Sequence, residues 1–475
     1  MKLFGTDGIR GEVGLEPINK DSLRKIGFSL AETLFKNKNG LFLISNDGRE
    51  SCGDIQQYLY EGIKHQGCDA VSIGLMTTPG LSISLNKQSE KLIAGIQITG
   101  SHNLYQDNGM KIFNSLGMKL DDNLEKEIEK IFNSIDNIPV PFKSISSLKS
   151  TIISGHNKSL ENFHMIYINE LIKLINKKKL KNKHNYKILL DCANGAASEI
   201  VNKVFLDDKK NTDGFSVLPI WDKPNGKNIN KDCGAAYPKN LSKEICRHQK
   251  SNISNSSLLV DFGVALDGDG DRAIFVLPDG SILDGDEILF ILTKHKKDFQ
   301  SYNRAVVGTV MTNYGIKNDF KKNSIEFHET MVGDKHIIKK MIEVDADIGG
   351  ESSGHIILSN NDNFLVGDGL ITLINIVSAL DDQKSTLTDL KQIINKTPSR
   401  LINLKVADKL KFVNDTENIE IIENMKNMIK GNGKILVRES GTEDLIRLFI
   451  QHENTEEIER LLNYFYDNIN KKHLL

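Results

Sequence analysis

The sequence lacks both a marked excess of charge and a long apolar run. Its 61 basic and 63 acidic residues leave a net charge of -2, so no general attraction to nucleic acid or to an anionic membrane is expected. The most apolar stretch, Leu370–Leu380, is about half as long as a membrane-spanning helix and contains Thr372, Asn375 and Ser378. No apolar signal region follows Met1. We therefore expect a cytoplasmic protein with no nucleic-acid or membrane partner.

Cysteine is also scarce, and its spacing argues against several kinds of site. No two cysteines form a C-x-x-C pair, so neither a zinc knuckle nor a thioredoxin-like motif is expected. An odd and scattered set is typical of reduced thiols rather than of a disulfide framework. The set comprises Cys52, Cys68, Cys192, Cys233 and Cys246.

The chain does contain a repeated alternation of short apolar strands and amphipathic helices. Residues 41–45 predict a buried strand and residues 53–65 a helix, and the pattern restarts at 187–191, 258–266 and 305–309. Strands that alternate with helices predict α/β layers around parallel sheets. At 475 residues the chain is too long for one core, so we expect three or four domains.

Two stretches of weak periodicity, residues 134–158 and 381–400, are interpreted as linkers. The expected architecture is four domains, of which three are mixed α/β units and the last is smaller. The expected borders are 1–150, 158–257, 258–380 and 381–475.

A polar segment follows the strand predicted at 94–99. In Thr99–Asn103 a glycine precedes Ser101, which lets the hydroxyl project from a sharp turn, and His102 adjoins it. The segment is not the G-x-S-x-G elbow of hydrolases, because Asn103 occupies the second glycine position. By itself the segment leaves an ordinary polar turn open as well as a nucleophile.

Three carboxylates alternate with two glycines in Asp267–Arg272. They can converge on one hard cation, and oxygen ligands suit Mg²⁺ or Ca²⁺. An EF-hand would need glycine and glutamate where Arg272 and Pro278 stand, so that calcium loop is excluded. A solvated turn is the alternative, but clustered carboxylates repel one another unless a cation neutralises them. We predict Mg²⁺ here, with Arg272 as a phosphate donor beside the ligands Asp267, Asp269 and Asp271.

Two further loops carry groups suited to a sugar phosphate. Gly349–His355 offers a carboxylate, hydroxyls and an imidazole, although a hairpin turn would also fit this segment. Arg438–Glu443, followed by Arg447, combines arginines with hydroxyls and lacks the spacing of a Walker loop. Together with the serine and the cation site, these loops predict phosphoryl transfer in which one phosphate is held while another moves.

These segments and their order resemble the α-D-phosphohexomutases, and most closely the bacterial phosphoglucosamine mutases. The resemblance covers nearly the whole chain, including the opening Phe4–Gly11. It also rests on Asp191–Ala196, Pro224–Asn230, Asp267–Arg272, Glu351–His355 and Arg438–Arg447.

The resemblance implies three related α/β units and a C-terminal α+β lid around one cleft. It implies an intramolecular phosphotransferase, an isomerase in which Ser101 is phosphorylated and its phosphate binds Mg²⁺ together with the three aspartates. Phospho-Ser101 would phosphorylate glucosamine 6-phosphate, and the bisphosphate would turn over and return its 6-phosphate, leaving glucosamine 1-phosphate. This phosphorylated amino sugar would feed the synthesis of UDP-N-acetylglucosamine.

The resemblance also implies roles for single residues. Lys111 matches a position proposed for acid/base work, for which a base needs a lowered pKa. Arg10, His102 and Arg272 would neutralise the transferring phosphoryl group, and Arg49 would support the cleft. The implied substrate-binding residues are Arg272, Glu351, Ser353, His355, Arg438, Ser440, Gly441, Thr442 and Arg447.

The chain departs from the family pattern in its loops. Gly100 stands where alanine is usual and Leu104 where proline is usual, and both changes are expected to loosen the serine loop. Ser352 occupies the variable position of the sugar loop, and a threonine pair is replaced at 365–366. In the phosphate loop, Glu439 and Asp444 replace lysine and proline.

Two alternative functions remain open on the sequence. One is a phosphomannomutase or phosphoglucomutase of the same family, although His355 favours the glucosamine enzyme because glucose-specific relatives usually lack this histidine. The other is a non-catalytic sugar-phosphate-binding protein, suggested by the loop departures and opposed by the intact Ser101 and Lys111. Both a monomer and a homodimer are compatible with the sequence.

Overall fold

The computed structural model describes residues 1–35, 40–87, 92–136, 157–178, 180, 184–207, 214–255, 258–299, 305–359, 364–429, 431–439 and 445–469. The chain divides into two compact units, which are Met1–Val310 with His328–Lys391 and Met311–Phe327 with Gln392–Leu475. Within the described residues, three mixed sheets are followed by one antiparallel sheet, as the sequence predicts.

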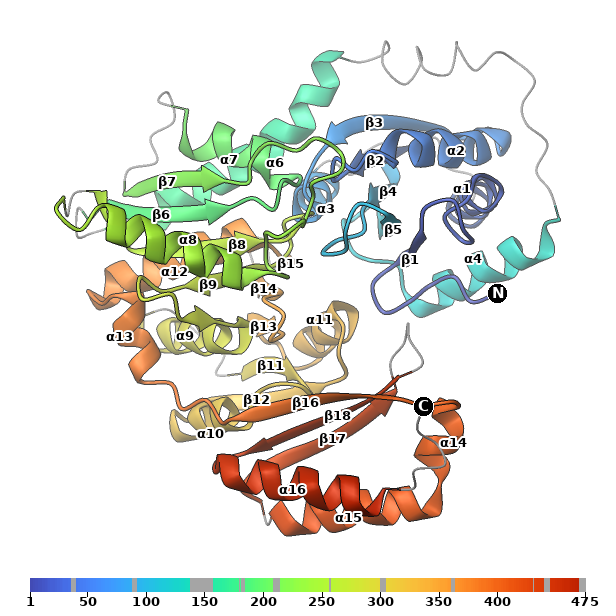
Figure 1. Cartoon of the computed structure of the whole chain (residues 1–475). Coiled ribbons are helices and arrows are strands. Elements are labelled where there is room, and N and C mark those ends of the chain that lie inside the picture. The colour runs from blue at the N-terminus through green and yellow to red at the C-terminus, as the bar shows by residue number, and fades with distance from the viewer. Residues whose placement is uncertain are drawn as a thin grey trace. The chain divides into compact units, whose positions relative to one another are not determined.

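The first sheet and its helices comprise β1 (Ile9–Glu12), α1 (Lys20–Leu34), β2 (Leu41–Asn46), α2 (Cys52–His65), β3 (Asp69–Leu75), α3 (Thr78–Lys87), β4 (Leu92–Ile98), β5 (Asp107–Asn114) and α4 (Asp122–Ser134). The strand order is β1-β5-β4-β2-β3, with β2, β3 and β4 parallel and β5 antiparallel to β4 (Figure 1). Four consecutive residues of β2 are buried, as expected for a strand covered on both faces. The predicted strand at 41–45 and helix at 53–65 are confirmed.

The second sheet and its helices comprise α6 (Asn157–Lys178), β6 (Tyr186–Asp191), α7 (Ala197–Phe205), β7 (Phe215–Ile220), α8 (Pro238–Ser251), β8 (Phe262–Leu266), β9 (Ala273–Val276) and β10 (Ile282–Leu283). The strand order is β10-β9-β8-β6-β7, and β8 pairs in parallel with β6. The metal loop therefore follows a strand of this sheet. The predicted border at residue 258 falls between two strands of one sheet, because β8 pairs with β6 on one side and with β9 on the other.

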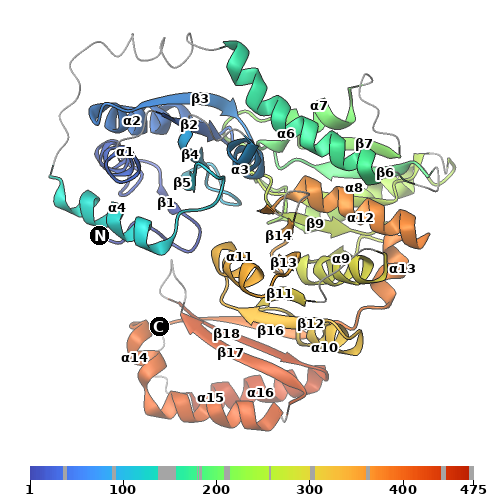
Figure 2. The same cartoon turned by 180° about the vertical axis from the view of Figure 1, so that it is seen from behind.

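The third sheet comprises β11 (Ala305–Thr309), β12 (Glu326–Thr330), β13 (Ile348–Gly350), β14 (Ile356–Ser359) and β15 (Leu365–Gly367), with α9 (Gly285–Phe299), α11 (Asp334–Glu343), α12 (Gly369–Gln383) and α13 (Leu387–Gln392). The strand order is β12-β11-β13-β14-β15. Strands β13 and β14 form an antiparallel pair, so the Glu351–His355 loop is a hairpin connection. Helix α12 begins at its N-cap Asp368 and packs against α6 (Figure 2).

The second compact unit contains α10 (Tyr314–Lys322), β16 (Ser399–Lys405), α14 (Lys409–Asn414), α15 (Thr416–Ile429), β17 (Gly433–Glu439), β18 (Leu445–His452) and α16 (Thr455–Asn468). Strand β18 lies between β16 and β17 and is antiparallel to both. Buried side chains of this sheet and of α14, α15 and α16 form a separate core, as a small α+β domain requires.

The structure bears on the predicted linkers, on the cysteines and on the expected absence of a membrane-spanning helix. The linker predicted at 381–400 is wrong in part, because α12 extends to Gln383 and α13 buries Leu387 and Leu390. The linker predicted at 134–158 falls mainly outside the described residues. The cysteines are all free thiols. Among the helices described, none is long and apolar enough to cross a bilayer.

Candidate active site

Ser101 lies in the loop between β4 and β5, beside the loop that follows β8. Its side chain is buried, and its backbone is in the left-handed region at φ 51°. The Ser101 hydroxyl donates to the carboxylate of Asp267 at 3.0 Å and lies 3.3 Å from Nδ1 of His102. Asn230 of the second domain donates its amide to the Ser101 carbonyl at 2.7 Å. The chain thus joins the serine loop of one sheet to the acidic loop of the next.

Arg49 holds the serine loop in this position. Its guanidinium is fully buried, and its Nε donates to Asp47 at 2.9 Å. A Cβ atom added to Gly100 would lie 2.8 Å from the Arg49 Cζ, so glycine permits the close approach of the guanidinium. These contacts show how Arg49 would support the site, as predicted. The carbonyls that accept from Arg49 are those of Ser101, Asn103, Leu104 and Asp107.

The three predicted metal ligands lie together and are buried. One carboxylate oxygen from each of Asp267, Asp269 and Asp271 lies within 4.8 Å of the other two. Thr78 donates its hydroxyl to Oδ2 of Asp269 at 2.5 Å, but among the described residues Oδ1 of Asp269 has no hydrogen-bond partner. Burial and the two neighbouring carboxylates raise the pKa of Asp267 well above its usual value. Crowded oxygens and an unpaired buried acceptor are the features that a hard cation would satisfy.

Lys111 points from β5 into the same cluster. Its ammonium lies 2.8 Å from Asp269, 2.5 Å from Asp271 and 3.2 Å from Asp7. Burial alone would lower the pKa of Lys111, but these carboxylates outweigh burial and raise it well above its usual value. A base requires the opposite direction, so in this arrangement Lys111 is a fixed positive charge at neutral pH.

The other predicted charge-neutralising residues, Arg10, His102 and Arg272, lie around the acidic cluster, and His102 lies beside the Ser101 hydroxyl. Arg10 donates to Asp7 at 2.9 Å, and Nε of Arg272 lies 3.7 Å from Asp267. Burial, followed by the positive charges of Arg272 and Arg10, lowers the pKa of His102 to about 4. His102 is therefore neutral near pH 7 and can take part as a hydrogen-bonding group, while the two arginines carry the positive charge.

The sugar loop is attached to the acidic cluster through His355. Nδ1 of His355 lies 3.6 Å from Asp271, and Nε2 lies 3.8 Å from Asp334. Burial alone would lower the pKa of His355, but Asp271, Asp334 and Glu351 raise it to about 9. Ser353 donates to Glu351 at 3.2 Å. The structure thus brings all the predicted residues of the first compact unit into one neighbourhood.

The predicted phosphate loop belongs to the second compact unit. Arg438 on β17 and Arg447 on β18 are direct cross-strand partners, so both guanidinium groups rise from one face of the sheet. The remaining predicted residues of this loop, Ser440, Gly441 and Thr442, lie outside the described residues. The role of the loop stays a prediction.

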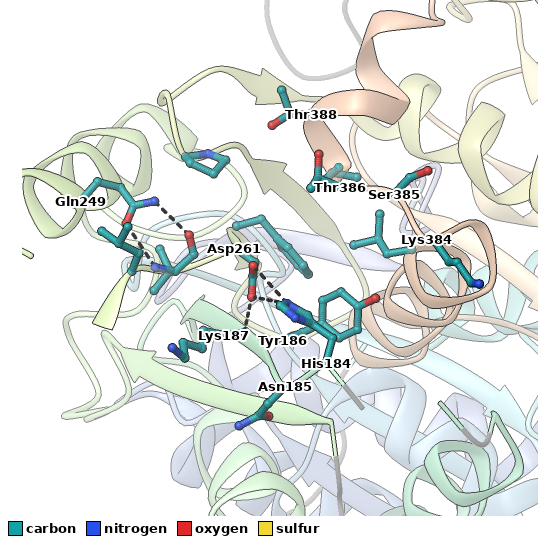
Figure 3. Close-up of a pocket in the computed structure, with 16 residues that line it drawn as sticks. His184, Asn185, Tyr186, Lys187, Gln249, Asp261, Lys384, Ser385, Thr386 and Thr388 are labelled. Carbon is teal, nitrogen blue, oxygen red and sulfur yellow. Dashed lines mark hydrogen bonds and ion pairs between the residues drawn. The ribbon is translucent and has the colours of Figure 1, made fainter. Parts of the chain in front are cut away.

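A cavity of about 720 Å³ lies elsewhere on the first unit, at the amino ends of β6 and β8 (Figure 3). His184 and Asp261 face each other there at 3.3 Å, and Gln249 hydrogen-bonds to the backbone of Val260. Ser101 and the metal loop follow the carboxyl ends of their strands instead. The cavity therefore contains none of the predicted site residues.

Several residues that hold the site together carry no role that can be recognised from the sequence. Asp7 belongs to the opening motif and Asn230 to a second-domain motif, so both segments were recognised but neither side chain was given a role. Lys119 and Asp334 bear no local pattern that marks them. Only the folded chain places the Lys119 ammonium against the carboxylates of Asp7 and Asp334.

The fold and this cluster define the class to which the protein belongs. Successive parts of the chain match the four models of one family, described as phosphoglucomutase/phosphomannomutase α/β/α domains I (residues 1–139), II (165–280) and III (284–397) and C-terminal domain (401–468). The chain belongs to the phosphoglucomutase/phosphomannomutase family, the α-D-phosphohexomutases, and is a mutase enzyme. The predicted family and fold class are confirmed.

Among its relatives are phosphoglucosamine mutases that match along nearly their whole length. The protein of Legionella pneumophila strain Corby is 33% identical over 471 residues, which span 99% of this chain and 96% of the relative. The protein of Caldicellulosiruptor bescii is 35% identical over 467 residues, spanning 97% and 96%.

Solved structures share the fold at lower identity. A family protein from Burkholderia thailandensis has a TM-score of 0.72 and 19% identity, covering 98% of this chain and 97% of its own. The N-acetylphosphoglucosamine mutase of Aspergillus fumigatus, solved in complex with GlcNAc-6P and magnesium, has a TM-score of 0.65 and 17% identity, covering 98% and 96%.

Proposed function

We propose that this mutase interconverts glucosamine 6-phosphate and glucosamine 1-phosphate, with Ser101 as the residue that carries the phosphoryl group. The observation that carries the proposal is the contact of the Ser101 hydroxyl with Asp267, 3.0 Å away in a buried cluster of three carboxylates. The names and the coverage of the phosphoglucosamine mutases among its relatives support the substrate.

The proposed cycle has two transfers that balance each other. In the first, the bond between phosphorus and Oγ of phospho-Ser101 breaks as a bond to the 1-oxygen of glucosamine 6-phosphate forms; the 1-hydroxyl loses its proton and Oγ of Ser101 takes one up. In the second, the 6-phosphoryl group of the bisphosphate moves to Oγ of Ser101, which loses its proton, and the 6-oxygen takes up a proton. The enzyme is restored and glucosamine 1-phosphate is released, so no external phosphate donor is consumed in each cycle.

The donor set fits Mg²⁺, which Asp267, Asp269 and Asp271 would hold together with the phosphate of Ser101. The unpaired Oδ1 of Asp269 supports this assignment. When bound, the ion would neutralise the carboxylates and part of the charge on the phosphoryl group. Lys111 already lies among the same carboxylates, so this chain supplies fixed positive charge of its own at this point.

Residues around the serine would bind and orient the substrate. Arg10 and Arg272 lie close enough to His102 to lower its pKa, which puts their charges near the Ser101 hydroxyl. Glu351 and His355 offer a carboxylate and an imidazolium for the hydroxyl and amino groups of the sugar. In the second unit, the paired Arg438 and Arg447 would bind the phosphate that is not being transferred, since arginines bind phosphate through paired donors.

The test is mass spectrometry of the protein after incubation with glucosamine 1,6-bisphosphate and Mg²⁺. We expect one phosphate, on Ser101, and none in Ser101→Ala. Absence of the phosphate from the wild type would favour the non-catalytic sugar-phosphate-binding protein instead. Competition between glucosamine 6-phosphate, glucose 6-phosphate and mannose 6-phosphate tests the substrate, and equal turnover of the three would refute the glucosamine assignment.

A further inference from the structure

Lys119 lies where the first and third domains of the first compact unit meet. It follows β5 and precedes α4, and its ammonium contacts both Asp7 of the N-terminal segment and Asp334 at the start of α11. Its side chain is only 13% exposed, and those of Asp7 and Asp334 are 24% and 10% exposed. One cation therefore joins two largely buried carboxylates from distant parts of the chain.

Asp7 and Asp334 connect Lys119 to two different parts of the site. Asp7 lies 3.2 Å from the ammonium of Lys111, which in turn contacts the metal loop at Asp271. Asp334 lies 3.8 Å from His355 of the sugar loop, and His355 lies 3.6 Å from Asp271. The contacts close into a ring of alternating charge, in the order Asp7, Lys111, Asp271, His355, Asp334 and Lys119.

The loop before Asp334 reinforces the same junction. The backbone N–H of Gly333 donates to the Glu351 carboxylate at 2.7 Å, which ties this loop to the sugar loop. Gly333 has φ 123°, and a Cβ atom there would lie 2.7 Å from the methyl group of Thr6. The loop that carries Asp334 is thus packed tightly between the sugar loop and the N-terminal motif.

The charges of the ring explain what Lys119 contributes. Without its ammonium, Asp7 and Asp334 would face each other as like charges, and their repulsion would separate the segments that carry them. Asp7 would keep Arg10 and Lys111, and Asp334 would keep His355, so neither carboxylate would be left without a counter-charge. The expected consequence is a displaced sugar loop in a folded protein.

We propose that Lys119 is a positioning residue that sets the place of the sugar loop relative to Ser101, acting through Asp7 and Asp334. This inference rests on the proposed function only for its kinetic consequence. Within the described part of the chain, the Lys119 ammonium pairs with Asp7 and Asp334 and with none of the three metal-loop aspartates, so its effect passes through these two carboxylates.

Lys335 provides a matched control at the same junction. It lies next to Asp334 on α11, and its ammonium pairs with Asp122 at 2.8 Å and Glu125 at 2.9 Å, both on α4. It therefore joins the same two domains through two carboxylates, with its side chain 21% exposed, but it is not a member of the ring. A role in domain adhesion alone would make the loss of either lysine equivalent.

The experiment compares Lys119→Met, Lys119→Arg and Lys335→Met with the wild type. With glucosamine 6-phosphate, Mg²⁺ and glucosamine 1,6-bisphosphate, we expect Lys119→Met to lower kcat/KM by about tenfold to 100-fold, because small misplacements of reacting groups cost rates of this order. Lys119→Arg should recover most of the loss, and Lys335→Met should stay within about twofold of the wild type, as expected for a more exposed ion pair.

Hydrogen–deuterium exchange of the sugar-loop segment 348–358 supplies a readout that is independent of activity. Exchange there should rise in Lys119→Met and stay unchanged in Lys335→Met. Equal effects of the two methionine variants on exchange would overturn the inference, as would an unchanged kcat/KM in Lys119→Met. An inactive wild type would instead refute the proposed function, and the exchange comparison would still decide the role of Lys119.

Discussion

Replacing Arg49 by lysine should slow phosphorylation of Ser101 without removing the positive charge. Arg49 donates to five acceptors, which are the Asp47 carboxylate and the carbonyls of Ser101, Asn103, Leu104 and Asp107. A lysine has three donors on one atom, so at least two acceptors would lose their partner. At about 1.5 kcal/mol for each hydrogen bond to a charged group, the serine loop would lose about 3 kcal/mol.

If that loss acts on the loop geometry needed for transfer, it corresponds to a decrease of about 100-fold in rate. The assay is the rate at which glucosamine 1,6-bisphosphate phosphorylates Ser101, followed by intact mass spectrometry. Arg24→Lys is the matched control. Arg24 is also buried in the first domain, and its Nε lies 2.6 Å from the carboxylate of Glu61, a residue outside the serine loop. Phosphorylation of Arg49→Lys at the rate of Arg24→Lys would refute the reasoning.

Three further predictions follow from single contacts and charges. Gly367→Ala would place a Cβ atom 2.2 Å from Nε2 of His355, so we expect KM for the sugar phosphate to rise by about tenfold or more in steady-state kinetics. Burial raises the pKa of Asp191 from 3.8 to about 7, so the stability that the protonated group contributes below about pH 4 is lost as the pH rises through 7. The free energy of urea unfolding of the wild type, taken relative to that of Asp191→Asn, should therefore fall by about 4 kcal/mol as the pH rises from about 4 to above 7, and a pH-independent difference would contradict the prediction. Arg438→Ala should weaken substrate binding more than it slows phosphorylation of Ser101, and unchanged affinity would contradict its assignment to phosphate binding.

Much of the first compact unit could be predicted because each site loop follows a strand with a clear local pattern. The apolar run at 41–45 and the helix at 53–65 are recognisable without tertiary information, since burial and periodicity leave a direct trace in the residues. The alternation of aspartate and glycine in Asp267–Arg272 likewise predicts a cluster of carboxylates, which the structure contains.

The border predicted at residue 258 shows what a local sequence pattern cannot determine, which is the sheet that a strand joins. The pattern of strand and loop at 258–266 is real, but which sheet a strand joins depends on its partner. In the structure, β8 pairs with β6, although the expected borders put β6 in the second domain and β8 in the third. The hydrogen bonds that decide this pairing are made between segments distant in the chain, so no window of sequence contains them.

The sequence by itself determined the α/β alternation, the serine loop, the acidic loop and the family to which they belong. Only the tertiary structure decided that Lys119 contacts Asp334 and that Arg49 donates hydrogen bonds to four backbone carbonyls of the segment 101–107. It also decided the raised pKa of Lys111, which depends on burial and on three carboxylates from separate segments. The physical reason is that residue type and spacing specify which groups are available, whereas distances and solvent exclusion, which set their energies, exist only once the domains are packed.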